Sequence, residues 1–165
     1  MTTRIRILIA EDNEFVRQQV RRCLEHSGRF DVLAEACDGT EAVRLIAQCQ
    51  PAVVLMDISM PRMNGLEVTE YVTRQFPGVR VIIHSSSTEP NIVRQAFQMG
   101  ASAYVVKGNV PQLTLIIEEV AAGKIYTDAL DFNDASAENL VHGQNRPPVN
   151  DNQEPRKGPL NTSEG

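Results

Sequence analysis

Acidic residues follow two of the most apolar segments of this chain. Asp57 closes the run Ala52–Met56, and the pair Glu11 and Asp12 closes the run Arg4–Ala10. Both runs have the length and β-branched content of strands buried on both faces, and open α/β sheets bind ligands at the carboxyl ends of such strands. If the strands are neighbours, three carboxylates meet, and two unit charges about 4 Å apart repel by about 4 kcal/mol at an effective dielectric of about 20. The cluster therefore needs protons or a hard cation, and an all-oxygen site suits Mg²⁺.

The elements that must hold these residues are strands and helices in alternation up to about residue 124. Apolar residues at helical spacing, such as Val16, Val20 and Leu24, mark the first helix, and Gly28 is typical of its end. The predicted strands cover residues 4–10, 31–36, 52–57, 79–84 and 101–106, and the predicted helices cover 13–27, a segment that ends before Pro51, 66–76, 89–99 and 109–122. Five such units imply a parallel sheet with right-handed crossovers and helices on both faces.

The composition narrows the class of protein. Of 165 residues, 42% are hydrophobic and 22% are charged, which is ordinary for a globular domain, and the net charge of −5 provides no general attraction to nucleic acid or to an anionic membrane. Three cysteines without a CxxC pair argue against a disulfide framework and for a reducing compartment. The start shows no signal-peptide pattern, and no apolar stretch approaches the ~18 residues that a membrane span needs. We therefore expect a cytoplasmic protein with no membrane partner.

The sequence divides into two parts near residue 126. Residues 128–165 contain four prolines, many amide and acidic residues and few large apolar ones. Such a segment cannot bury enough apolar surface to offset its ordering entropy. We expect one domain over residues 1–126 and a low-complexity, largely disordered tail over residues 127–165, in which residues 134–142 could form a short helix.

Further motifs follow the other predicted strands. Beside the acid pair Glu11-Asp12, the chain has Asp57-x-x-Met60-Pro61-x-Met63-x-Gly65, Ser85 at the end of the fourth predicted strand and Lys107 at the end of the fifth. Any one of these is a weak signal, but all of them in order at strand ends are specific. Over roughly residues 4–124 the chain resembles the receiver domain of bacterial response regulators. The resemblance implies a flavodoxin-like, doubly wound α/β fold with five parallel strands in the order 2-1-3-4-5 and five helices.

The resemblance also implies a metal and a nucleophile. Asp57 would take a phosphoryl group from a phosphohistidine and become an aspartyl phosphate. Asp12 and Asp57 would bind Mg²⁺ directly, the backbone carbonyl of Ser59 would complete the protein ligands, and Glu11 would reach the ion through water. One or two carboxylates with several waters suit Mg²⁺, which offsets the charge that builds when an anionic donor approaches an anionic carboxylate.

Three more residues take roles in the phosphoryl site and switch through the same resemblance. Lys107 would pair with one phosphoryl oxygen as a point charge, and Ser85 would donate its hydroxyl to another. Tyr104 matches the switch aromatic, whose ring turns inward once Ser85 moves toward the phosphoryl group. Taken alone, Lys107 is typical of a surface lysine and Tyr104 of an ordinary core or surface residue.

The first predicted helix carries the expected partner surface. Phe15 and Gln19 lie one turn apart and off its apolar stripe, and this part of the helix docks the phosphodonor in the family, although Phe15 could instead be packed. Arg17, Arg21 and Arg22 could form an anion site, but a solvated face is the simpler interpretation on an amphipathic helix.

Two positions depart from the common receiver pattern. Gly108 follows Lys107 where many receivers have proline, so no cis peptide bond is expected there. Together with the segments 100–107 and 123–126, this resembles the subgroup usually joined to LuxR-type helix-turn-helix output domains. His84 lies in the fourth predicted strand, at a position that is normally apolar in receivers. A buried histidine whose hydrogen-bonding groups have partners is more common at such a position than a pH sensor.

These inferences lead to a phosphoacceptor receiver of a two-component phosphorelay, which catalyses its own phosphorylation and dephosphorylation but turns over no external substrate. The expected partners are a sensor histidine kinase or histidine phosphotransfer protein and an unidentified downstream protein, and a homodimer is compatible with them.

The alternatives are a receiver-like scaffold that works without phosphorylation, the receiver part of a DNA-binding regulator, and a phosphatase of the haloacid-dehalogenase type. Phosphatases of the haloacid-dehalogenase type require a second aspartate two residues after the nucleophile, where this chain has Ser59. No recognition helix follows the receiver pattern, so we expect no direct DNA binding by this chain.

Overall fold

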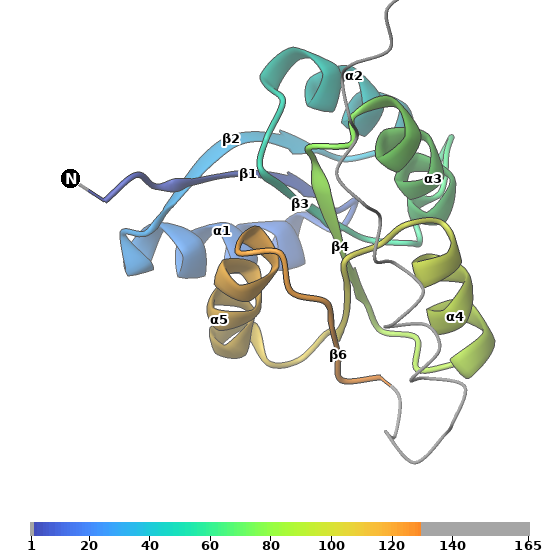
Figure 1. The fold of residues 1–165 in the computed structure, drawn as a ribbon. Coiled ribbons are helices and arrows are strands. Elements are labelled where there is room, and N and C mark those ends of the chain that lie inside the picture. The colour runs from blue at the N-terminus through green and yellow to red at the C-terminus, as the bar shows by residue number, and fades with distance from the viewer. Residues whose placement is uncertain (1, 130–165) are drawn as a thin grey trace, which may run out of the picture.

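The computed structural model describes residues 2–129, which form a parallel β-sheet covered by helices on both faces (Figure 1). The strands are β1 (Ile5–Ala10), β2 (Phe30–Ala36), β3 (Val53–Met56), β4 (Arg80–Ser85), β5 (Ala103–Val106) and β6 (Tyr126–Thr127), in the order β2-β1-β3-β4-β5-β6. The helices are α1 (Glu14–Ser27), α2 (Gly39–Cys49), α3 (Gly65–Gln75), α4 (Pro90–Gln98) and α5 (Val110–Ala121). The predicted parallel sheet with strand order 2-1-3-4-5 and five helices is confirmed, and β6 is an additional short strand at its edge.

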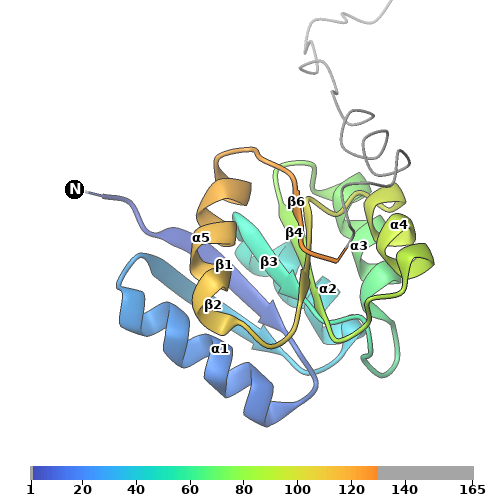
Figure 2. The ribbon, with the colours of Figure 1, turned by 90° about the horizontal axis from the view of Figure 1, so that it is seen from below.

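Side chains of each central strand alternate between two hydrophobic cores. Leu8 and Val54 pack on the side of α2, α3 and α4, while Ile7 and Leu55 pack on the side of α1 and α5. Figure 2 shows these two helical layers on opposite sides of the sheet. Because β1 and β3 are buried on both faces, they read as continuous apolar runs rather than alternating ones, as a parallel sheet requires.

Polar caps start the helices soon after the strands end. The Asn13 side chain accepts from the amide of Val16 (3.1 Å), and the Asp38 side chain accepts from the amide of Glu41 (2.8 Å). Asn109 caps α5 in the same way, as the sequence predicts. These side chains satisfy amides that the first helical turn leaves without partners, so the loops at the carboxyl ends of the strands are short and well defined.

The loop between β3 and α3 folds back against the backbone of Asp57. The amide of Gly65 donates to the carbonyl of Ile58 (2.9 Å), and a Cβ at Gly65 would lie 2.0 Å from the carbonyl oxygen of Asp57. Only a glycine permits this approach, because the obstructing atoms belong to the backbone and cannot rotate away. The residue that starts α3 therefore helps to set the position of Asp57.

Residues 125–129 extend the domain beyond the five predicted units. Tyr126 and Thr127 pair with Ala103 and Tyr104 of β5, so the predicted boundary at 126/127 falls within β6. The remainder of the predicted tail, residues 130–165 with the predicted helix at 134–142, lies outside the described residues. Among residues 2–129, no helix is long and apolar enough to cross a membrane.

We expect Gly65→Ala to destabilise the domain by about 2 kcal/mol or more, because the added methyl group overlaps the Asp57 carbonyl. Urea unfolding followed by circular dichroism measures the change. Gly78→Ala is the matched control, since a Cβ there meets nothing within 4 Å, and it should change stability by less than about 0.5 kcal/mol. Equal stability of the two variants would contradict the close approach at Gly65.

Candidate functional site

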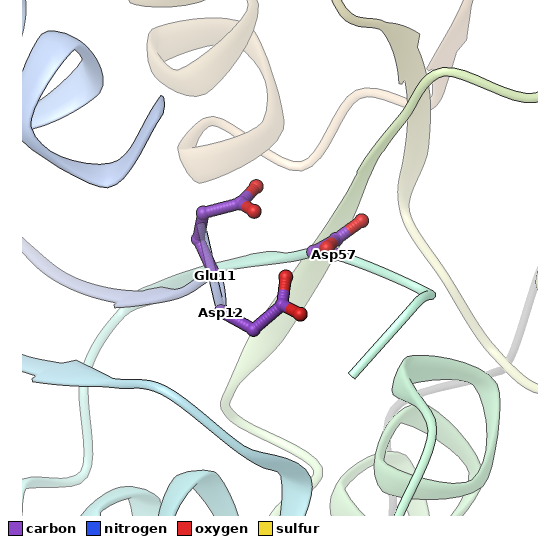
Figure 3. A group of neighbouring side chains, drawn as sticks. All are labelled: Glu11, Asp12 and Asp57. Atoms are coloured by element: carbon purple, nitrogen blue, oxygen red, sulfur yellow. The ribbon is translucent and has the colours of Figure 1, made fainter. Parts of the chain in front are cut away.

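Three carboxylates meet at the carboxyl edge of the sheet. Glu11 and Asp12 follow β1, Asp57 follows β3, and one carboxylate oxygen of each lies within 4.8 Å of the others. Figure 3 shows Asp12 reaching from the end of β1 toward the end of β3, where Asp57 lies. The sequence predicted this cluster from strand ends, and the parallel pairing of β1 with β3 brings it together.

Backbone hydrogen bonds extend the ladder to the residues that carry these side chains. The amide of Asp57 donates to the carbonyl of Ala10 (2.9 Å), and the amide of Glu11 donates to the carbonyl of Ala36 (3.0 Å). On the other side of the site, the amide of Lys107 donates to the carbonyl of Ser85 (2.9 Å). The functional side chains therefore start from backbone that has the rigidity of the sheet.

Lys107 closes the site from the end of β5. Its Nζ lies 2.7 Å from Glu11 Oε2 and 3.1 Å from Asp57 Oδ1, and it thus bridges the two buried carboxylates. Asp12 is exposed and pairs with neither this lysine nor any other cation in the described part of the chain. The site thus has one lysine for two buried acids and an open third acid that faces solvent.

Burial and the neighbouring charges change the proton affinity of Asp57. Burial raises the pKa of the Asp57 carboxyl to about 6, repulsion by Glu11 adds to the rise, and Lys107 acts against it. For Lys107 itself, burial lowers the pKa, but the hydrogen bond with Glu11 and the attraction of Asp57 outweigh burial and leave the pKa above its usual value. The ammonium therefore stays charged, while Asp57 binds a proton more readily than an exposed aspartate does.

Ser85 and Tyr104 lie beside the acid cluster on the side of β4 and β5. Ser85 is buried at the end of β4, and its hydroxyl accepts from the amide of Ser87 (3.2 Å). The Tyr104 ring is fully buried and its hydroxyl donates to the carbonyl of Ser87 (2.9 Å). Burial raises the pKa of Tyr104, whereas its hydrogen bonds with Ser85 and Ser87 lower it. The ring thus has the inward orientation in this structure.

Comparison with known proteins identifies the family. The family model of the response regulator receiver domain matches residues 7–118. The chain belongs to this family. The receiver is 35% identical over 124 residues to the transcriptional regulatory protein DegU of Brevibacillus brevis, covering 74% of this chain and 52% of DegU. It is 37% identical over 123 residues to the response regulator UvrY of Escherichia coli, covering 74% of this chain and 56% of UvrY. The chain thus spans about half the length of these curated relatives.

Solved structures agree with this assignment. A DNA-binding response regulator of the LuxR family from Staphylococcus aureus aligns with a TM-score of 0.68 at 32% identity, covering 71% of this chain and 98% of that chain. A two-component response regulator of the LuxR family from Aurantimonas aligns with a TM-score of 0.72 at 28% identity, covering 86% of this chain and 98% of that chain. The predicted resemblance to the LuxR-type subgroup is confirmed.

The α1 surface of the receiver differs in part from the prediction. Phe15 is 69% exposed, so it is not packed, and Gln19 is also exposed, which leaves both free to contact a partner. Arg17 is not part of a solvated face. Its Nη1 donates to the carbonyl of Glu11 (2.8 Å), and its Nε lies 3.6 Å from Glu35. Sequence reasoning missed this support of the β1–α1 loop because the partner carbonyl becomes a neighbour only after folding.

His84 is buried next to the site, as expected. It is 5% exposed and lines a small cavity with Glu11 and Asp57. Burial, and secondarily the charge of Lys107, lowers the pKa of His84 to about 4. The imidazole is therefore neutral near pH 7, and it adds no second positive charge to the cluster.

We expect Asp57→Asn to be more stable than the wild-type receiver at about pH 7.5 when no divalent cation is present, by about 1–3 kcal/mol. The folded chain holds the Asp57 proton up to about pH 6, whereas the unfolded chain releases it near its usual pKa. Wild-type stability therefore falls as pH rises through this window, and the asparagine variant avoids that loss.

Urea unfolding in EDTA at several pH values measures the difference, which should shrink as the pH falls toward about 4. Asp31→Asn, at an exposed position on β2, is the control and should follow the wild type at every pH. A wild-type receiver more stable than Asp57→Asn at about pH 7.5 would contradict the raised pKa of the Asp57 carboxyl.

Proposed function

We propose that the receiver accepts a phosphoryl group on Asp57 from a phosphohistidine of a sensor kinase or a histidine phosphotransfer protein. The carboxylate oxygen attacks phosphorus, the P–N bond to histidine breaks, and an aspartyl phosphate forms. The observation that carries this proposal is the position of Lys107 Nζ, 3.1 Å from Asp57 Oδ1, at an edge where two further carboxylates converge. A lysine in this position can pair with a phosphoryl oxygen as the charge of the donor arrives.

The donor set fits Mg²⁺. Asp12 and Asp57 would hold the ion directly together with the backbone carbonyl of Ser59, and Glu11 would act through water. All these donors are oxygen atoms, and Asp12 is open to solvent, which leaves room for the waters that Mg²⁺ retains. When bound, the ion neutralises the charge that an anionic donor brings to an anionic nucleophile. The repulsion by Glu11 that adds to the raised pKa of the buried Asp57 supports this fit, because a cation between the carboxylates would relieve it.

The proposed switch follows from the contacts of Ser85, Lys107 and Tyr104. Ser85 would donate its hydroxyl to a phosphoryl oxygen, and Lys107 would turn from Glu11 toward the phosphoryl group. The Tyr104 hydroxyl interacts with Ser85 and Ser87, so movement of this segment is transmitted to the ring. On this proposal the receiver catalyses its own phosphorylation and dephosphorylation and turns over no external substrate.

The partners would be a sensor histidine kinase or a histidine phosphotransfer protein upstream and a further protein downstream; the chain spans about half the length of its curated relatives. The exposed pair Phe15 and Gln19 on α1 supports docking of the phosphodonor there. The scaffold alternative is less well supported, since the chain has Glu11, Asp57 and Lys107 in contact with one another through the lysine. The net charge of −5 supports the expectation that this chain alone does not bind DNA, which fluorescence anisotropy with duplex DNA would test.

We expect the wild-type receiver to form an alkali-labile phosphorylated species with acetyl phosphate and Mg²⁺, and Asp57→Asn to form none. Intact-mass spectrometry before and after alkaline treatment measures the change. Lys107→Ala is the comparison variant and should still accept phosphate, because the attacking carboxylate of Asp57 is intact. Label of equal yield on Asp57→Asn, mapped to another residue, would refute the assignment of the nucleophile.

A further inference from the structure

The segment that follows α5 returns to the sheet and covers the edge of β5. Tyr126 pairs with Ala103 and Thr127 with Tyr104, and the amide of Tyr126 donates to the carbonyl of Ser102 (3.1 Å). Figures 1 and 2 both show β6 between α4 and α5, at this edge. The family match ends at residue 118, so this strand lies outside the part of the chain that it covers.

Asp128 contacts β5 on both sides of Val105. One of its carboxylate oxygens, Oδ1, accepts from the amide of Val106 (2.9 Å), and its own amide is 3.4 Å from the carbonyl of Tyr104. Val106 directly precedes Lys107, whose amide is held from the opposite side by the carbonyl of Ser85. The backbone at the end of β5, just before the lysine, is therefore held on both sides, by β4 on one side and by Asp128 on the other.

Side chains of the same segment pack against both hydrophobic cores. Ile125 and Ala129 pack against the core that contains Tyr104, whereas Tyr126 packs against the core on the opposite face of the sheet. The segment thus straddles the edge of β5 and holds it from both faces. The structure with this segment in place is also the one in which the Tyr104 ring is fully buried.

We propose that Asp128 is a positioning residue for the phosphoryl site, acting through β5 on Lys107 and Tyr104. The inference rests on the proposed function. When residues 125–128 pair with β5, Lys107 is held where it reaches Asp57, and Tyr104 is held inward. Coupling of this kind is reciprocal, so the docked segment strengthens binding of a phosphoryl group and a phosphoryl group strengthens docking of the segment.

Binding of beryllofluoride, a phosphoryl mimic, at saturating Mg²⁺ tests the inference, with ¹⁹F NMR of the bound species as the readout. We expect Asp128→Ala to weaken beryllofluoride binding about 3- to 10-fold, the value of one hydrogen bond. Asp128→Asn should bind within about twofold of wild type, because its amide oxygen can still accept from Val106. Asp31→Ala, which removes an exposed acid from the opposite edge strand, is the matched control. Mg²⁺ affinity should be unchanged in all three, since its proposed ligands are not on β5.

A double-mutant cycle with Lys107→Ala separates positioning from general destabilisation. If Asp128 acts through Lys107, the effect of Asp128→Ala on beryllofluoride binding disappears in the Lys107→Ala background, whereas general destabilisation would persist there and would weaken Mg²⁺ binding too. Hydrogen exchange on the wild type gives a second measurement that needs no variant. Beryllofluoride should slow exchange of the Val106 and Tyr126 amides.

The outcomes distinguish the two proposals. A wild-type chain that binds no beryllofluoride would overturn the proposed function. A wild-type chain that binds it, with equal affinity in Asp128→Ala or with no added protection of Val106 and Tyr126, would overturn the role of Asp128 alone.

Discussion

The contact of one lysine with two buried carboxylates governs the rest of this structure. Glu11 and Asp57 are almost fully buried, and ionised carboxylates in such places are costly unless they are paired. Lys107 meets both of them, at 2.7 Å and 3.1 Å. The three residues come from β1, β3 and β5, so the contact exists only when the whole parallel sheet is in register. The fold thus serves to hold two acids and their shared cation at one edge.

The negative charges of this cluster outnumber its positive charge, and a cluster of this kind can respond to an added cation or phosphoryl group. With Asp12 added, three acids face one lysine, and repulsion by Glu11 adds to the rise in the pKa of Asp57 that burial causes. A divalent cation would relieve the surplus, and a phosphoryl group would then compete with Glu11 for Lys107. Lys107 directly follows β5, the strand that carries Tyr104, pairs with β6 and is contacted by Asp128. On the proposal above, a change in the contacts of Lys107 is therefore transmitted to Tyr104 and to this segment.

Much of this could be predicted from the sequence because the relevant signals are local. Apolar runs that end in acid mark strands buried in a parallel sheet, and parallel strands bring their carboxyl ends to one edge, so Glu11, Asp12 and Asp57 could be placed together. Other features depend on contacts between distant segments and leave no local pattern. A two-residue strand such as β6 forms only because β5 offers an open edge, and the bond from Arg17 to the Glu11 carbonyl requires the folded loop. The pairing of Lys107 with Glu11 was missed for the same reason, since the sequence pattern points only to the phosphoryl group as its partner.

The most direct measurement of the central claim is the Mg²⁺ affinity of Lys107→Ala against wild type, by calorimetric titration at about pH 8, where the carboxylates are ionised. If Lys107 is the internal cation of the acid cluster, its removal leaves the same three acids without a competing charge. Mg²⁺ should then bind about tenfold more tightly or better in the variant. Unchanged or weaker Mg²⁺ binding in a folded Lys107→Ala chain would contradict the account, because the lysine would then not be what balances Glu11 and Asp57.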